Sequence, residues 1–283
     1  MSALRELMTG LIDYAGLFPP AALEMDAAVH NYEAYLRGPD AWALGRFVVP
    51  AARLEDLAGR PFRLTVLGPP NPSLANARGS EAPVRGRQEA VIDAVELKAE
   101  RPDDVLRAMG AVPKGPATYI EIPIAQDPEP LVAALAQTGA RAKVRTGGLT
   151  AEGFPRSQEL ARFLHACAAR KVAFKATAGL HHPLRSAHRF TYAADSPSGV
   201  MHGFVNVFLA ACLVYFGAES NDAWETLEER SANAFRFEDS NVSWHGHHLA
   251  AHQIRTARTE FAMSFGSCSF EEPMAEVKEL GWL

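Results

Sequence analysis

The chain has 283 residues and a formal net charge of −5, with 48% hydrophobic and 22% charged residues. A chain of this length forms one large α/β domain or two small ones, and its composition is that of an ordinary soluble globular protein. The negative charge, together with the lack of a basic run interleaved with aromatics, excludes broad nucleic-acid binding, so we expect no nucleic-acid partner.

The first half of the chain predicts helices alternating with strands. The expected elements are, in order, a helix at 1–17, a break at 18–22, a helix at 25–37, a strand at 46–50, a helical turn at 53–57, strands at 62–68 and 90–98, a helix at 102–109, a strand at 118–124 and a helix at 128–137. Residues 69–89 are rich in Pro, Gly, Ser and Arg and predict no regular element. In the strand at 118–124, a period of two places Tyr119 and Glu121 together, opposite a face of isoleucines.

The middle of the chain predicts two lysine-bearing strands joined by a helix. The strands at 141–147 and 172–179 flank apolar residues at helical spacing, and such a unit normally places its two strands side by side and parallel. Alternation puts Lys143 and Arg145 on one face of the first strand, and Lys175 lies near the end of the second. We therefore expect these three cations to meet at one end of a sheet.

The second half of the chain supplies the remaining elements. We expect a loop at 183–200, a buried helix at 201–217, a polar helix at 222–234, a strand with its loop at 235–246, a helix at 247–259, a strand at 261–270 and a closing helix at 271–282. Eight strands separated by helices predict a single-domain α/β protein over 1–283, a (β/α)8 TIM-type barrel with an inserted helical segment near 183–234. The competing fold is an open doubly wound sheet, which the lack of a GxGxxG motif after the first strand disfavours.

The paired lysines favour one kind of chemistry. A lysine buried beside another cation loses its proton more easily, and imine formation needs the free amine. At an ordinary pKa near 10.4, roughly one lysine in a few thousand is neutral at pH 7, and lowering the pKa by about three units corresponds to roughly 4 kcal/mol. The pattern thus favours Schiff-base catalysis on a carbonyl compound. The simpler interpretation is an anion-binding face in which Lys143, Lys175 and Arg145 hold a phosphate or carboxylate.

Five motifs occur in an order that matches a known family. They are LIDYAGLFPPA at 11–21, AVIDAVEL at 90–97, KVRTGG at 143–148, VAFKATAG at 172–179 and FGSCS at 265–269. Through them the chain resembles deoxyribose-phosphate aldolase, a family of the class I aldolase barrel superfamily. The resemblance implies that Lys143 forms the imine, Lys175 lowers its pKa, Asp93 relays a proton, and Gly266 and Ser267 face a phosphate.

The choice of the imine lysine and the choice of the proton-transferring acid both stay open. VAFKATAG itself reads as Lys-x-Thr-x-Gly, so Lys175 is the alternative imine residue. Among the acids, alternation allows at most one of Asp93 and Glu96 to point inward, and it makes Tyr119 and Glu121 the better interior pair. An inward carboxylate either shuttles a proton or neutralises the lysines.

Histidines give a rival signal. They cluster in the second half of the chain, at His181, His182, His202, His245, His247, His248 and His252. Such density is one way to bind zinc or another divalent metal, and we expect His248 and His252 to share a helix face. Loop histidines also line substrates, and His181 follows the second lysine strand at the end where barrel active sites lie. We assign His181 and His202 to substrate binding and no residue to a metal.

Cysteine spacing, the N-terminus and the apolar segment indicate the cellular compartment. The three cysteines are too widely spaced for a disulfide framework or a zinc ribbon. The N-terminus lacks the pattern of a signal peptide, and the apolar segment 204–216 is too short to span a bilayer, so we expect a cytoplasmic protein without membrane association. That segment is either core or a subunit interface, which leaves a homo-oligomer open.

These observations together predict an aldolase-like carbon–carbon lyase that uses a lysine Schiff base on a small oxygenated carbonyl substrate, with or without a phosphate. It would need no cofactor. The expected catalytic residues are Lys143, Lys175, Asp93 and Glu121, and the expected substrate-binding residues are Arg145, Thr177, His181, His202, Gly266 and Ser267. The alternatives are a metal-dependent lyase or isomerase that uses the histidines, and a non-catalytic barrel that binds anions.

Overall fold

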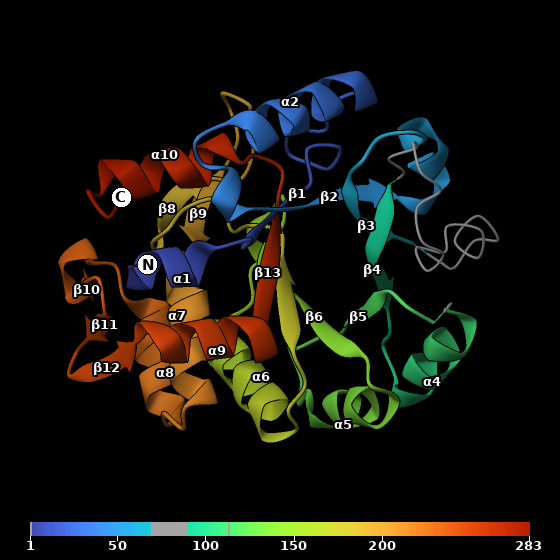
Figure 1. The fold of residues 1–283 in the computed structure, drawn as a ribbon. Coiled ribbons are helices and arrows are strands. Elements are labelled where there is room, and N and C mark those ends of the chain that lie inside the picture. The colour runs from blue at the N-terminus through green and yellow to red at the C-terminus, as the bar shows by residue number, and fades with distance from the viewer. Residues whose placement is uncertain (1, 69–89, 113) are drawn as a thin grey trace.

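Eight parallel strands close into a barrel in the computed structural model, which describes residues 2–68, 90–112 and 114–283 (Figure 1). Around the barrel they follow the order β1, β13, β7, β6, β5, β4, β3, β2. Their bounds are β1 (Ile12–Tyr14), β2 (Leu44–Pro50), β3 (Arg63–Leu67), β4 (Val91–Lys98), β5 (Ala117–Glu121), β6 (Arg141–Arg145), β7 (Phe174–Thr177) and β13 (Ala262–Ser267). With helices between the strands, this architecture confirms the predicted (β/α)8 TIM-type barrel.

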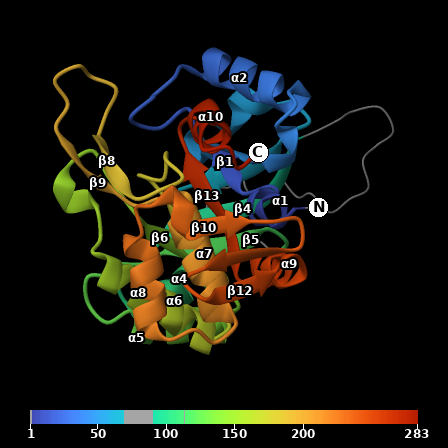
Figure 2. The same ribbon diagram turned by 90° about the vertical axis from the view of Figure 1, so that its left-hand side faces the viewer.

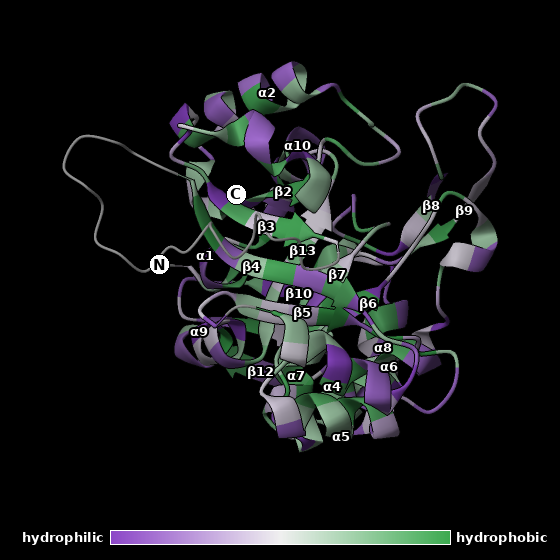
Figure 3. Cartoon of the chain, turned by 90° about the vertical axis from the view of Figure 1, so that its right-hand side faces the viewer, coloured by the Kyte–Doolittle hydropathy of each residue, from purple (hydrophilic) through white to green (hydrophobic). Residues whose placement is uncertain are grey.

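Helices surround the barrel (Figures 1 and 3). They are α1 (Ala3–Met8), α2 (Met25–Arg37), α4 (Pro102–Ala111), α5 (Glu129–Thr138), α6 (Ser157–Ala169), α7 (Phe204–Tyr215), α8 (Ser220–Glu228), α9 (Ala251–Glu260) and α10 (Glu271–Glu279). Figure 3 shows mostly hydrophobic strands inside and hydrophilic residues concentrated on the helices. In α6, for example, Leu160, Phe163 and Leu164 recur at helical spacing and are fully buried, so one apolar stripe fixes the helix to the sheet.

The apolar helix α7 belongs to the core of this single chain. Every residue from Phe204 to Val214 is buried, and the helix contacts α6, α8, α9 and β13. The sequence left core and subunit interface as alternatives for this segment, and the packing shows that it is core. Among the described helices, none has both the length and the apolar character needed to cross a lipid bilayer.

One barrel strand lies where the sequence predicts a helix. The predicted helix at 1–17 is wrong beyond Met8, because Ile12–Tyr14 forms β1 and pairs with β13 and β2. Three residues are too few to show a period of two, and the helical pattern of α1 precedes them directly.

The predicted barrel strand at 235–246 is also wrong. It is an antiparallel hairpin of β10 (Phe235–Phe237) and β11 (Asn241–Trp244), which continues into β12 (His247–Ala250) outside the barrel. Since β12 replaces the start of the predicted helix at 247–259, His248 lies on a strand and His252 on α9, and the two do not share a helix face.

The predicted loop at 183–200 contains a small antiparallel ribbon, β8 (Ser186–Arg189) and β9 (Ser198–Met201). Figure 2 shows this ribbon and its connecting loop projecting from the body of the molecule. The other predicted irregular segment, 69–89, falls outside the described residues.

The two lysine strands end in a close backbone contact. A Cβ atom at Gly147, after β6, would lie 2.6 Å from the Cα of Gly179, after β7. Gly179 also has a φ of +73°, which favours glycine. Thr146 ties the same two segments together, because its hydroxyl donates to the carbonyl oxygen of Ala178 at 2.6 Å. These contacts fix the strand ends that carry the lysines.

Candidate active site

The two lysines lie side by side inside the barrel. Strands β6 and β7 are neighbours, and Lys143 is paired in register with Lys175. Their side chains are only 3% and 1% exposed. The flanking residues Ala142 and Val144 are fully buried, which fits a strand that is covered on both faces. The barrel therefore brings both predicted lysines into its interior.

Glu96 connects the two lysines. It comes from β4, and its Oε2 lies 2.7 Å from Nζ of Lys143 while its Oε1 lies 2.5 Å from Nζ of Lys175. Burial alone would raise the pKa of this carboxyl, but the attraction of two ammonium groups outweighs burial and lowers the pKa to about 2. Glu96 is therefore ionised at neutral pH and bridges two cations.

Each lysine has a second carboxylate partner. Lys143 Nζ lies 2.9 Å from Oε2 of Glu121, at the end of β5. Lys175 Nζ donates to Oδ2 of Asp13 at 2.6 Å, and the hydroxyl of Ser264 donates to the same oxygen at 2.9 Å. Three carboxylates thus surround the two lysine amino groups in a buried region, where unpaired charges would be costly.

The protonation of Lys175 differs from the sequence prediction. Burial alone would lower the pKa of Lys175, but the charges of Asp13 and Glu96 raise it above its ordinary value. The expectation that crowded cations lower a lysine pKa does not hold for Lys175, because carboxylates stand between the cations. The ring of Tyr119, whose centroid lies 5.6 Å from Nζ, also favours the ammonium form.

A cavity of about 250 Å³ opens above this cluster. Its polar lining includes Lys143, Lys175, Arg145, Thr177, His181 and Gly266. Phe18, Phe190 and Met201 contribute apolar walls. The site thus brings together both lysines and four of the six predicted substrate-binding residues, at the carboxyl ends of the strands where barrel enzymes bind their substrates.

The predicted catalytic residue Asp93 lies apart from the lysines. Its Oδ2 accepts a hydrogen bond from Nε of Arg63 at 2.6 Å and lies 3.3 Å from Nε of Arg46. The pairing of β3 with β4 shifts register at this point, so Leu64 pairs with Ile92 but Thr65 pairs with Ala94. This irregularity lets Asp93 face the arginines, while Glu96 is the β4 carboxylate that reaches the lysines.

Two predicted substrate-binding residues are engaged with the protein itself. His202 is buried, and its Nε2 lies 2.8 Å from the carbonyl oxygen of Pro155. Burial lowers the pKa of His202 to about 4, so this ring is neutral at neutral pH. Ser267 is also buried, and its hydroxyl accepts from the backbone N–H of Ser269 at 3.3 Å. Neither side chain is part of the cavity lining as the described residues define it.

Sequence reasoning gave no catalytic or binding role to Asp13. It matches the opening motif of the aldolase resemblance, yet its lysine partner lies 162 residues away along the chain. Its carboxylate also needs a glycine beside it, since a Cβ at Gly45 would come within 2.3 Å of Asp13 Oδ1. The available sequence signal was its place in the LIDYAGLFPPA motif that carries the aldolase resemblance.

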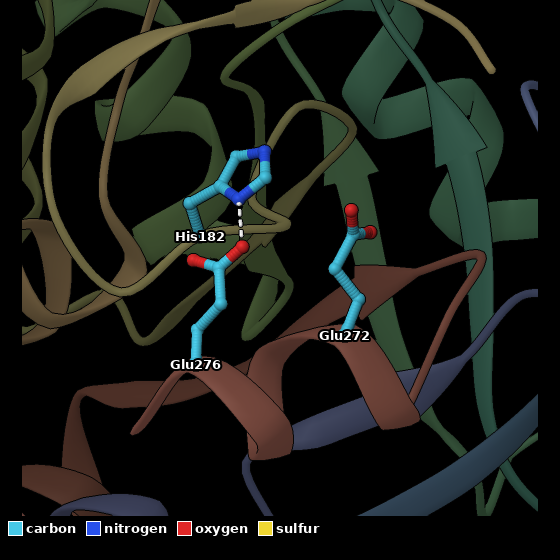
Figure 4. Close-up of side chains that lie close together, drawn as sticks. All are labelled: His182, Glu272 and Glu276. Atoms are coloured by element: carbon cyan, nitrogen blue, oxygen red, sulfur yellow. Dashed lines mark hydrogen bonds and ion pairs between the residues drawn. The ribbon is translucent and has the colours of Figure 1, made fainter. Parts of the chain in front are cut away.

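A second group of polar side chains lies at the rim of the barrel. His182 follows β7, and its Nδ1 lies 2.6 Å from Oε1 of Glu276 on α10 (Figure 4). His181 Nδ1 lies 3.1 Å from Oε2 of Glu272 on the same helix. Among the described residues, His182, Glu272 and Glu276 form the one group that has the donor atoms and the spacing to hold a metal ion.

Comparisons with protein-family models, with curated proteins and with solved structures found no match for this chain. The case for a function therefore depends on the residues and geometry described above and on the resemblance carried by the motifs.

Proposed function

We propose that this barrel is an aldolase-like carbon–carbon lyase in which Lys143 forms a Schiff base with a small oxygenated carbonyl substrate. The observation that carries the proposal is the pair of buried lysines, bridged by Glu96, which border one cavity. A buried lysine among carboxylates beneath an open cavity is a setting in which an amine can both react and exchange protons.

Lys143 is the better nucleophile of the two. Lys175 is held as an ammonium by Asp13 and Glu96, and Asp13 is fully buried. Glu121, the second partner of Lys143, is at the end of β5 and retains some exposure. In the proposed reaction a proton passes from Lys143 Nζ to Glu121 Oε2 over 2.9 Å, against the lowered pKa that the charge of Lys143 gives this carboxyl, and leaves a neutral amine.

In the proposed reaction, Glu121 takes up and returns each proton. The amine of Lys143 attacks the carbonyl carbon, and Glu121 returns its proton to the hydroxyl of the carbinolamine, which leaves as water. Glu121 then takes the proton of the β-hydroxyl group while the adjacent carbon–carbon bond breaks and its electron pair forms an enamine. Protonation of the enamine carbon by Glu121 and hydrolysis release the second product and restore Lys143. The ammonium of Lys175 and the carboxylate of Glu96 hold the amine in place.

The substrate's anionic group would face Arg145. This side chain is 49% exposed, lines the cavity, and lies 3.6 Å from Glu121 through its Nε. Thr177 and Gly266 line the same cavity. The first turn of α10 carries Glu271 and Glu272, and two negative charges at a helix N-terminus disfavour an anion there. A carboxylate or phosphate on the arginine side is therefore the better arrangement.

A non-catalytic anion-binding barrel is the second candidate. The observation in its favour is that both lysines are fully ion-paired, as a purely structural cluster would be. Such a protein would be stabilised by small anions without turning over any carbonyl compound.

The test is borohydride trapping with a panel of small aldehydes, ketones and sugar phosphates, read by peptide mass spectrometry. We expect a reduced adduct on Lys143 in the native protein and none at that position in Lys143→Met. Lys98→Met is the matched control, because Lys98 also contacts Glu121, at 3.4 Å, but is 68% exposed; trapping on Lys143 should persist in it. An adduct on Lys175 would reverse the roles of the lysines, and no adduct across the panel would remove the imine mechanism.

A further inference from the structure

The rim group joins two segments that are far apart in the sequence. His182 belongs to the loop after β7, whereas Glu272 and Glu276 lie one turn apart on α10 (Figure 4). Residues four apart on a helix share a face, so both carboxylates point toward the same loop. One donor atom from each of the three side chains lies within 4.8 Å of the others. The group is separate from the ion pairs of Lys143 and Lys175.

The charges in this group are not balanced by permanent cations. The carboxylates are 28% and 30% exposed, and within the described part of the chain neither has a lysine or arginine partner inside ion-pair distance. The groups that face them are the imidazoles of His181 and His182. Two negative charges and a nearby imidazole are a donor set suited to a cation.

We propose that His182, Glu272 and Glu276 bind one divalent transition-metal ion, such as Zn²⁺ or Mn²⁺. Imidazole nitrogen and carboxylate oxygen are both zinc ligands, and a set of three protein ligands leaves a fourth position for water or another oxygen ligand. A cavity of about 300 Å³ borders the group; its lining includes two of the three proposed ligands, His182 and Glu272, together with His188, Arg189 and Tyr192.

The geometry needs only small side-chain movements. Zinc bonds of about 2.1 Å place tetrahedral ligand atoms about 3.4 Å apart. That separation falls between the 2.6 Å contact from His182 to Glu276 and the 4.8 Å outer limit of the group. The ion would take the place of the direct hydrogen bond between His182 Nδ1 and Glu276 Oε1.

Neighbouring residues orient the proposed ligands. The hydroxyl of Tyr192 donates to Oε2 of Glu272 at 3.2 Å, and Nδ1 of His181 approaches the same oxygen at 3.1 Å. The ring of His188 stacks on that of His182 with centroids 3.3 Å apart and an interplanar angle of 8°. Partners of this kind fix ligand orientation in metal sites. His181 also lines the lysine cavity, so the ion would lie beside the mouth of the proposed active site.

Two other histidines also contact carboxylates. His245 Nε2 lies 2.8 Å from Glu229, and His247 Nε2 lies 3.4 Å from Asp222, in the region of the hairpin and α8. These pairs lie outside the proposed group, so a variant of His247 serves as a control.

The experiment measures metal binding to the full-length protein after chelation and removal of the chelator. Calorimetric titration with Zn²⁺ should give one site per chain, and Co²⁺ should give the visible absorption of a low-symmetry four- or five-coordinate site. Glu272→Gln/Glu276→Gln should weaken binding at least 100-fold, with its fold verified by circular dichroism. Glu271→Gln removes one carboxylate charge from an exposed position of α10 and should bind normally.

Two outcomes would overturn the proposed metal site. One is failure of the native protein to bind Zn²⁺ or Mn²⁺. The other is unchanged binding in the double variant, especially if His247→Gln abolishes it. The inference does not depend on the lyase proposal, because Lys143→Met should bind one equivalent of metal whether or not imine trapping succeeds.

Discussion

The interior lysine cluster and the rim histidine group both contain carboxylates, but the basic side chains that face those carboxylates differ. Inside the barrel, Glu96 is buried and touches two ammonium groups. At the rim, Glu272 and Glu276 retain nearly a third of their exposure and face imidazoles. The carboxylates of the interior cluster therefore contact lysine amino groups, whereas those of the rim contact imidazoles, which are also common metal ligands.

This contrast separates two kinds of site. Where charges are buried, each partner is indispensable, because removing one leaves the other unpaired in a medium that solvates it poorly. Where solvent reaches the carboxylates, each ion pair contributes little to stability, so a partner can be exchanged at little cost. We infer that the interior pairs hold one fixed arrangement, while the rim carboxylates can accept the cation proposed above.

The largest expected effect comes from Glu96→Gln. The substitution removes the shared countercharge of Lys143 and Lys175, and losing one partner of a buried ion pair typically destabilises a protein by about 3–5 kcal/mol. Urea unfolding at pH 7 should show a loss of this size. The exposed Glu100→Gln, at the end of the same strand, should change the free energy of unfolding by less than about 0.5 kcal/mol. A loss below about 1 kcal/mol in Glu96→Gln would show that the interior is better solvated than its burial indicates.

Acid should destabilise the protein mainly through the interior carboxylate Glu96. The folded pKa of Glu96, about 2, is lower than the value of about 4.3 expected for an unfolded glutamate. A carboxyl with a lowered folded pKa contributes stability above its unfolded pKa and loses it as the pH falls toward the folded value. Glu96 should thus contribute about 3 kcal/mol at pH 7 that is lost between about pH 5 and pH 2.

The measurement is the free energy of unfolding as a function of pH for the native protein, Glu96→Gln and Glu272→Gln. The slope below pH 5 should flatten most in Glu96→Gln. The pKa of Glu272 is also lowered, but partial exposure weakens its contribution, so Glu272→Gln should retain most of the native slope. Equal slopes in the native protein and Glu96→Gln would contradict the assigned ionisation of the interior.

The sequence predicted local patterns well and long-range contacts poorly. Alternation correctly placed Tyr119 and Glu121 on the interior face of β5, and the crossover pattern correctly made β6 and β7 neighbours. The short β1 escaped prediction because its role comes from barrel closure, which pairs Ile12 with Phe265 across most of the chain. Period and propensity describe neighbours along the chain, whereas closure depends on the whole barrel.

The same contrast between local patterns and long-range contacts holds for the site residues. Lys143, Lys175 and Glu121 lie on strands whose faces alternation could assign, and the structure brings them together. The rim group could not be found in this way, since His182 meets its acidic partners about ninety residues later on α10. Density along the sequence placed His182 in one cluster with six other histidines, but it could not identify the glutamates of α10 as partners.

The smallest expected effect comes from Glu276→Gln in metal-free protein. The substitution again removes one carboxylate charge, but Gln keeps an oxygen that can accept a hydrogen bond from Nδ1 of His182, and the position is 30% exposed. We expect a change in the free energy of unfolding below about 1 kcal/mol, measured beside Glu96→Gln in the same buffer. A loss comparable to that of Glu96→Gln would mean that the rim is as dependent on its countercharge as the interior. A small loss would confirm that burial, and not the number of acidic groups, decides which carboxylates this fold needs for stability and which remain free to bind a cation.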